Sequence, residues 1–115
     1  MATLYGTAKV IASIASGGTT SQVIGLQGRT LLGIQTPAAL TGTALTFEGS
    51  HDGETFVPLY DDAGTPAQIS LTVTTSRGYS LDPSKFAAWE YIKVVSGSAE
   101  GAARQIVLLT GRVLA

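Results

Sequence analysis

The sequence predicts an all-β protein, folded as a single antiparallel β-sandwich that is jelly-roll-like and spans residues 1–115. Short runs of β-forming residues alternate with breaks that contain Gly, Pro or Asp, as in sandwiches and barrels. The 15 threonines are stiff at χ1 and favour extended backbone. The 14 glycines interrupt every window in which a helix could form. A chain of 115 residues is long enough to bury its own core, so one domain is expected.

The turn signals divide the chain into nine expected strands. In chain order they are Tyr5–Ile14, Ser21–Leu26, Thr30–Gln35, Ala44–Ser50, Glu54–Tyr60, Gln68–Thr74, Gly78–Leu81, Glu90–Ser96 and Arg104–Val113. The breaks between them fall at Gly17-Gly18, Gly28, Pro37, Asp61–Gly64, Asp82-Pro83 and Gly97–Gly101. A single helical turn is expected at Asp82–Phe86, because Asp is a good N-cap and Pro suits the first helical position.

The strongest local signal is Asp52-Gly53, between the β-forming runs 45–47 and 55–57. A two-residue type I′ turn needs positive φ at both central residues, and Asp followed by Gly tolerates this well. The sequence therefore predicts a tight hairpin at this point. Residues two apart in a strand share a face. The expected core comprises Leu32, Ile34, Leu45, Phe47, Ile92 and Val94.

Composition limits the possible functions. The net charge is −1 and the pI is near 5.6, which argues against a nucleic-acid partner. No stretch approaches the roughly 20 apolar residues of a membrane helix, and the segment from Lys9 to Gly17 favours a strand over a signal peptide. There is no cysteine. Charged residues make up 13% of the chain, about half the usual fraction, which favours a protein packed against copies of itself or a larger assembly.

No constellation of residues indicates catalysis or a bound cofactor. The only histidine, His51, lies beside the predicted hairpin turn and is expected to be an exposed turn residue. The one acidic cluster that could form a calcium site consists of Asp52, Glu54, Asp61 and Asp62. Its spacing does not provide the six to eight oxygens that Ca²⁺ takes from an EF-type loop, and turns explain these residues better. We therefore expect no catalytic centre, no cofactor and no metal.

Strand alternation from Trp89 to Val95 puts Trp89, Tyr91 and Lys93 on one face, with Ile92 and Val94 on the other. Three roles for Trp89 remain open from the sequence. It covers the edge of the core beneath the Asp82–Phe86 turn, it anchors a protein interface, or it provides a stacking platform for a sugar.

The last strand is aliphatic on both faces. Alternation puts Ile106, Leu108, Thr110 and Leu114 on one face, and Val107, Leu109 and Val113 on the other. A sandwich strand with one solvated face should instead alternate apolar and polar residues. Either the N-terminal stretch around Val10 and Ile11 covers the second face, or another subunit does. The predicted interface residues are Val10, Ile11, Trp89, Tyr91, Val107, Leu109 and Val113.

Two segments carry a resemblance to a known family. They are GIQTPAALTGTALTFEGSHDGETFVPLYDDAG at 33–64 and WEYIKVVSG at 89–97. This pattern, from about Gly28 to near the C-terminus, resembles small structural proteins of tailed bacteriophages, of the capsid-decoration or cement type. The resemblance implies a homo-oligomer, trimer ahead of dimer, that binds the major capsid protein on the capsid surface of the virion after synthesis in the bacterial host cytoplasm. The alternative is a carbohydrate- or host-recognition module on a phage tail or fibre, since small sandwiches host both roles.

Overall fold

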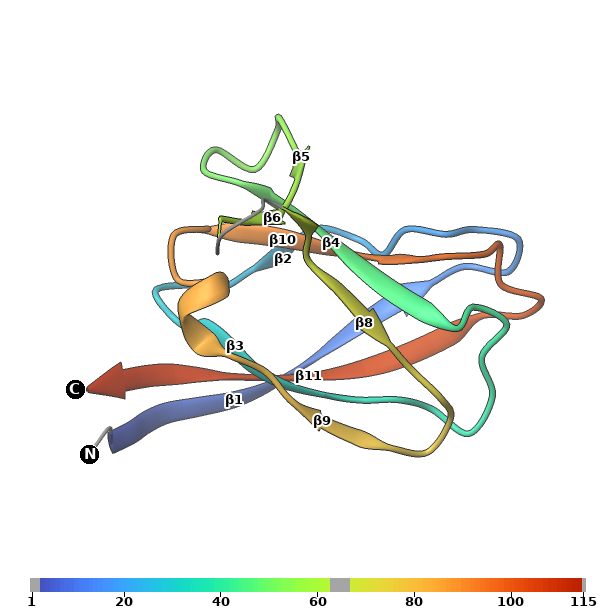
Figure 1. The fold of residues 1–115 in the computed structure, drawn as a ribbon, viewed down its shortest axis with the longest axis horizontal. Coiled ribbons are helices and arrows are strands. Elements are labelled where there is room, and N and C mark those ends of the chain that lie inside the picture. Colours follow the sequence, from blue (N-terminus) through green and yellow to red (C-terminus); the bar gives the residue numbers. More distant parts are fainter. Residues whose placement is uncertain (1–2, 63–66, 115) are drawn as a thin grey trace.

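A computed structural model describes residues 3–62 and 67–114 as two antiparallel sheets packed face to face (Figure 1). The strands are β1 (Thr3–Ile14), β2 (Ile24–Gly25), β3 (Thr30–Gln35), β4 (Ala44–Ser50), β5 (Val57–Pro58), β6 (Tyr60–Asp61), β7 (Ala67–Gln68), β8 (Ser70–Thr72), β9 (Gly78–Ser80), β10 (Tyr91–Ser96) and β11 (Arg104–Leu114). Sheet A has the order β1-β11-β3-β9. Sheet B has the order β2-β10-β4-β5, with β8 also paired to β4, and β6 and β7 form a separate short ribbon.

The chain crosses repeatedly between the two sheets. Every connection from β1 to β4, and again from β8 to β11, passes from one sheet to the other. The first and last strands lie side by side, paired from Thr3↔Leu114 to Ile14↔Arg104, and both termini lie at the same end (Figure 1). The predicted fold class is confirmed: the protein is an all-β antiparallel sandwich, jelly-roll-like in its crossings.

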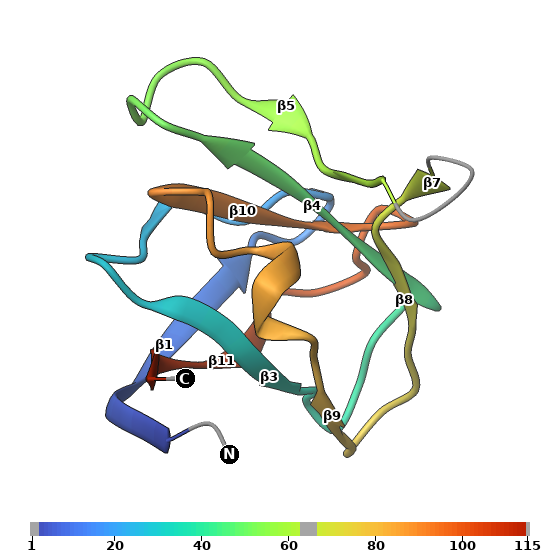
Figure 2. The same cartoon turned by 60° about the vertical axis from the view of Figure 1, so that its left-hand side comes forward.

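One short helix closes the end of the sandwich, as Figure 2 shows. This 3₁₀ helix, η1, spans Pro83–Lys85, and the Asp82 side chain caps it by accepting a hydrogen bond from the Ser84 backbone N–H at 3.0 Å. The predicted turn is therefore confirmed, with Pro83 in the first helical position. Directly after the helix, the buried Phe86 ring meets the Phe47 ring edge to face, with centroids 5.0 Å apart. η1 thus places the Phe86 ring between the two sheets.

The predicted core is confirmed except at Leu32. The inward side chains Ile34, Leu45, Phe47, Ile92 and Val94 are all buried. Leu32 is only partly buried and lies over Gly111 on the opposite face of sheet A, where an added Cβ on Gly111 would lie 2.8 Å from Leu32 Cδ1. The register explains this error: Leu109 pairs with Gly33 and Thr110 with Leu31, so Leu32 is an extra residue in a β-bulge. The bulge turns Leu31 inward in its place.

The predicted two-residue type I′ turn at Asp52-Gly53 is wrong, although the hairpin exists. β4 pairs with β5 across a loop of residues 51–56, and of the two expected positions only Gly53 has positive φ, at 80°. The Asp52 side chain organises this loop by accepting hydrogen bonds from the backbone N–H groups of Glu54 and Thr55, at 2.9 and 3.0 Å. A side-chain-bonded Asx turn therefore replaces the tight backbone turn.

Several predicted strands are shorter than expected. Ser21–Leu26 reduces to β2, Glu54–Tyr60 to β5 and β6, and Gln68–Thr74 to β7 and β8. These segments lie at sheet edges, where only part of a β-prone run finds a hydrogen-bonded neighbour. The expected turn at Asp61–Gly64 lies partly outside the described residues. Thr30–Gln35 and Ala44–Ser50, by contrast, match β3 and β4 at both ends.

Candidate functional site

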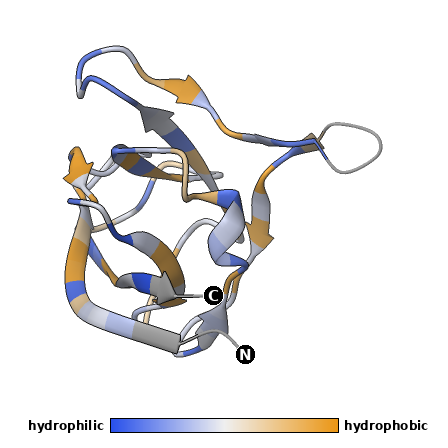
Figure 3. Cartoon of the chain, turned by 90° about the vertical axis from the view of Figure 1, so that its left-hand side faces the viewer, coloured by the Kyte–Doolittle hydropathy of each residue, from blue (hydrophilic) through white to orange (hydrophobic). Residues whose placement is uncertain are grey.

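The outer face of sheet A, turned away from sheet B, carries most of the predicted interface residues. Its aliphatic side chains are Ile11 on β1, Leu32 on β3, and Val107 and Leu109 on β11; Leu109 is 45% exposed. The register places Ile11 beside Val107 and Lys9 beside Leu109. Hydrophobic residues are concentrated on the strands, whereas the loop between β4 and β5 is largely hydrophilic (Figure 3).

No segment among the described residues covers this outer face. The N-terminal strand β1 does not fold over β11 as a covering arm; it pairs beside β11 as an edge strand of the same sheet (Figure 1). Of the two alternatives for the second face of the last strand, cover by the N-terminal stretch is therefore wrong, and cover by another subunit stays a prediction. Val10, one of the predicted interface residues, packs against the core instead, and the side chain of Val113 lies outside the described part of the structure.

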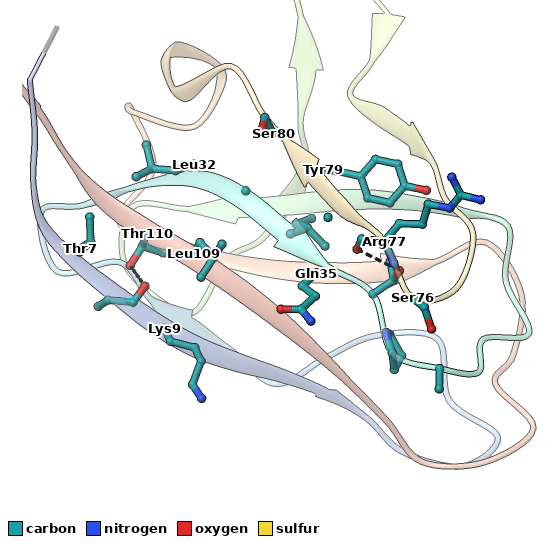
Figure 4. A pocket seen from close by; sticks show the side chains of 17 residues that line it. Thr7, Lys9, Leu32, Gln35, Ser76, Arg77, Tyr79, Ser80, Leu109 and Thr110 are labelled. Carbon is teal, nitrogen blue, oxygen red and sulfur yellow. Dashed lines mark hydrogen bonds between the residues drawn. The ribbon is translucent and has the colours of Figure 1, made fainter.

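A shallow groove runs across the outer face, between β11 and β9 (Figure 4). Leu32, Gln35 and Leu109 line it together with Gly33 and Gly78. Nothing lies within 4 Å of a Cβ built on Gly78. The missing side chain at Gly78 therefore allows another surface to approach the backbone of the sheet closely.

The structure separates Trp89 from Tyr91, which alternation had put on one face. β10 begins only at Tyr91, so the alternation does not extend back to Trp89. The indole of Trp89 lies on the inner side of sheet B, where a Cβ built on Gly49 would be 2.8 Å from its Cδ2 atom. The Tyr91 ring lies on the outer side, 3.7 Å from a Cβ built on Gly25. Trp89 is partly buried and packs against the core, which agrees with the first of the three roles considered, and it also lines a cavity at the end of the sandwich.

Two members of the acidic cluster, Asp52 and Asp61, form interactions within the protein. His51 is exposed. Hydrogen bonds from Glu54, Thr55 and Ser50 hold the pKa of the Asp52 carboxyl well below its usual range. Asp61 forms an ion pair with Lys85 at 3.0 Å. Within ranges 3–62 and 67–114, no three His, Cys, Asp or Glu side chains are grouped closely enough to hold a metal ion.

Sequence reasoning missed a fully buried carboxylate, Glu100, in the loop between β10 and β11. It accepts hydrogen bonds from the Thr41 and Gly42 backbone N–H groups at 2.8 and 2.9 Å, from Ser96 Oγ at 2.7 Å and from Arg104 Nε at 2.9 Å. Burial alone raises the pKa of Glu100, but these donors outweigh it and lower the pKa to about 2. All of its hydrogen-bonding capacity is used inside the protein, so this cluster holds loops together and offers nothing to a ligand.

Sequence reasoning also missed a cavity of about 600 Å³ at the end of the sandwich where the termini lie. Arg29, Arg112, Tyr5 and Trp89 contribute to its lining, together with residues of η1. The two arginines are far apart in the sequence but meet because Gly111 on β11 pairs with Thr30 on β3. Only the fold brings these positive charges together.

Comparisons with known proteins give a likeness of fold alone. The chain matches no family model and no curated protein sequence. It is similar in structure to the SPBc2 prophage-derived protein YomS, with a TM-score of 0.59 and 9% identity over 96% of this chain and 98% of that chain. A lower similarity, with a TM-score of 0.46 and 13% identity, extends to a Bacillus endospore appendage protein described as forming disulfide-linked pili; it covers 100% of this chain and 92% of that chain. No helix among the described residues is long and apolar enough to span a membrane.

Proposed function

We propose that this chain is a non-enzymatic structural protein of a tailed-phage particle. In this role it associates with copies of itself and binds the major capsid protein, decorating and stabilising the outer surface of the capsid. Its location would be the virion, after synthesis in the host cytoplasm. The proposal combines the resemblance in segments 33–64 and 89–97 with one structural observation, the uncovered outer face of sheet A.

The outer face supports self-association because it presents aliphatic side chains, of which Leu109 is exposed, among polar residues such as Lys9 and Gln35. Ile11 and Val107 lie side by side on neighbouring strands, with Leu109 next along β11. Soluble monomers usually avoid a contiguous exposed apolar patch. A second copy seated on this face would remove these side chains from water, at about 25 cal/mol per Å² of apolar surface buried.

Two further observations agree with an assembly role. Charged residues make up only 13% of the chain, so few charges need to be desolvated when a surface is buried. The structure of similar fold, YomS, is described as a prophage-derived protein. This likeness supports a phage origin and does not select a position in the particle.

Light scattering at micromolar concentration tests the self-association. The expected mass is a multiple of 11.8 kDa, a trimer or a dimer. Leu109→Glu should shift the mass toward that of the monomer, because it puts a charge into the proposed interface. The matched control is Val57→Glu on β5 of sheet B, since Val57 is also 45% exposed. A monomer mass that persists at high concentration would overturn the self-association.

Rebinding to capsids tests the role in the particle. Purified protein should bind to virions stripped of it, with a fixed number of copies per capsid, and should raise the temperature at which the capsids open. Leu109→Glu should reduce the number of copies bound and Val57→Glu should not. Failure of the wild-type protein to rebind would contradict the capsid assignment even if the protein is an oligomer.

A further inference from the structure

The cavity at the terminal end of the sandwich lies apart from the outer face of sheet A. Arg29 and Arg112 line it on one side, and Asp82 and Ser84 from the η1 region line it on another. Its volume of about 600 Å³ lies within the range of small-molecule binding sites. An inference about this cavity is independent of the proposed self-association.

The protein backbone holds both guanidinium groups in place. Arg29 Nε donates to the Gly6 carbonyl oxygen at 2.5 Å, and Arg112 Nη2 donates to the Gln27 carbonyl oxygen at 3.2 Å. Gly6 contacts both arginines, because a Cβ built on it would lie 2.7 Å from Arg112 Nη1. Each guanidinium has five N–H donors and uses one of them here, so several donors remain for a ligand.

Neither of these arginines forms an ion pair with a described residue, although the carboxylates of Asp82 and Glu90 line the same cavity. The ion pairs within residues 3–62 and 67–114 are Lys85–Asp61 and Arg104–Glu100, and neither involves Arg29 or Arg112. Two like charges that contact the same glycine repel each other, and the repulsion grows in a partly enclosed site. An anion between them would relieve it and would be bound by charge-assisted hydrogen bonds.

The backbone near the arginines has positive φ at three positions. Gly6 and Gly28 have φ of 61° and 79°, and a Cβ on Gly28 would lie 3.6 Å from Arg112 Nη2. Gln27 has φ of 56°, a left-handed conformation that costs a non-glycine residue roughly 1–2 kcal/mol. Strained backbone that persists beside a cavity is typical of binding sites.

The rest of the lining suits a sugar ring. Tyr5 is 48% exposed and offers an aromatic face, with Trp89 and Ala88 as further apolar surface. Ser84, Asp82 and Glu90 also line the cavity, and carboxylate oxygens that are not already bonded to Ser84 can accept hydrogen bonds from hydroxyl groups. Sugars combine an apolar C–H face with many hydroxyl donors, which matches this mixture of groups.

We infer that this cavity binds an acidic saccharide unit, a sugar that carries a carboxylate or a phosphate. The anionic group lies between Arg29 and Arg112, and the ring packs against Tyr5. A free carboxylate or phosphate offers the same charge without the ring, so small anions serve as the reference ligands.

Titration of the full-length ¹⁵N-labelled protein, followed by NMR, tests this inference. The probes are glucuronate and glucose 6-phosphate, with glucose, acetate and inorganic phosphate as references. Trp89 is the only tryptophan, so its indole N–H gives a single signal at the cavity wall. At least one acidic sugar should shift this signal and the Arg29 Nε–H signal to saturation, with at least tenfold higher affinity than glucose. It should also bind more tightly than the small anion that carries the same charge.

Two outcomes would overturn the inference. If no acidic sugar gives a saturable shift, the cavity binds no acidic saccharide. If acetate or phosphate binds as tightly as the matching sugar, the cavity is an anion site that does not recognise the ring. The wild-type titration decides between these outcomes without relying on any variant.

Variants locate the site. Arg29→Gln and Arg112→Gln should each lower the affinity for the acidic sugar at least tenfold. The matched control is Arg77→Gln, which removes the same charge from an exposed arginine outside the cavity and should leave the affinity unchanged. Equal losses in all three variants would indicate a general charge effect and contradict the site. Leu109→Glu should leave sugar binding intact, so failure of the proposed assembly and failure of this site are distinguishable.

Discussion

Strand β11 carries an arginine near each end, and the two arginines differ in whether a carboxylate lies beside them. Arg104, at its first residue, donates to the buried Glu100 carboxylate at 2.9 Å. Arg112, eight residues and about 26 Å along the strand, donates to a backbone carbonyl and lies near Arg29. Both guanidiniums are held in place, but among the described residues only Arg104 of the two has a carboxylate partner.

This difference separates a structural cluster from a binding site. At the Arg104 end, four donors satisfy one carboxylate, and the Glu100 backbone also bonds to Gly17 and Gly18, so three loops are joined. At the Arg112 end, two arginines line a cavity, and Arg112 donates to the carbonyl of Gln27, whose backbone is left-handed. The first arrangement stabilises the fold. The second costs stability and leaves two positive charges available to a ligand.

The largest effect expected is loss of the Glu100 cluster. Glu100→Ala should destabilise the protein by about 3–5 kcal/mol, because it leaves Arg104 and two backbone N–H groups without their acceptor in a buried site. Urea unfolding followed by Trp89 fluorescence measures this. The matched control is the exposed Glu90→Ala, which should cost less than about 0.5 kcal/mol. Similar losses for both would mean that Glu100 does not hold the loops together.

Acid should remove the stabilisation by Glu100 without mutation. The pKa of Glu100 is about 2 in the folded state against 4.5 for an unperturbed carboxyl, so the unfolded chain takes up the proton first as the pH falls. The free energy of unfolding should therefore be highest above about pH 5 and should fall by about 3 kcal/mol toward pH 2. Urea titrations at a series of pH values measure the slope.

Glu100→Gln isolates this contribution, because it removes the titrating group and keeps its shape. Its unfolding free energy should fall less steeply with acid than that of the wild-type protein. The remaining slope would come from Asp52 and Asp82, whose carboxyl pKa values are also lowered by local hydrogen bonds. An unchanged slope would show that Glu100 does not titrate in this range.

The fold class was predictable because the sequence of each central strand contains the turn signals and apolar residues that define it. β3 and β4 match their predicted bounds, since turn signals flank each of them and their apolar residues are buried between two sheets. The Leu32 bulge and the division of Glu54–Tyr60 into two strands depend on which neighbours the chain pairs with. Local sequence does not encode such pairing.

The two charged clusters were less accessible to sequence reasoning. Glu100 lies in a loop of small residues, and its one signal is the arginine four positions later in a chain with few charges. Arg29 and Arg112 gave no signal, because only the pairing of β11 with β3 brings them together. The apolar outer face was predictable from Val107 and Leu109, and what covers it stays a prediction.

A glycine series tests whether the Arg112 end is built around the guanidinium. Gly6→Ala should cost about 1–2 kcal/mol or more, because φ is 61° and the new Cβ would lie 2.7 Å from Arg112 Nη1. Gly17 also has a positive φ, of 80°, but nothing lies within 4 Å of the added Cβ, so Gly17→Ala measures backbone strain alone. Gly78→Ala has neither feature and should be near neutral. If Gly6→Ala and Gly17→Ala cost the same, contact with Arg112 contributes nothing at Gly6.

The smallest effect distinguishes the two ends of β11 most directly. Arg112→Gln should change the stability by less than about 0.5 kcal/mol, because it removes a charge that forms no ion pair with a described residue. Arg104→Gln should cost about 1–3 kcal/mol, because it weakens a buried, charge-assisted hydrogen bond to Glu100.

Urea unfolding in about 0.01 M and about 0.15 M salt gives a second measure, since the Debye length falls from about 30 Å to about 8 Å. Relative to wild type, Arg112→Gln should gain stability at low salt, where its repulsion with Arg29 is least screened. Equal losses at both arginines, independent of salt, would mean that Arg112 has a structural role equivalent to that of Arg104, and the contrast between the two ends would not hold.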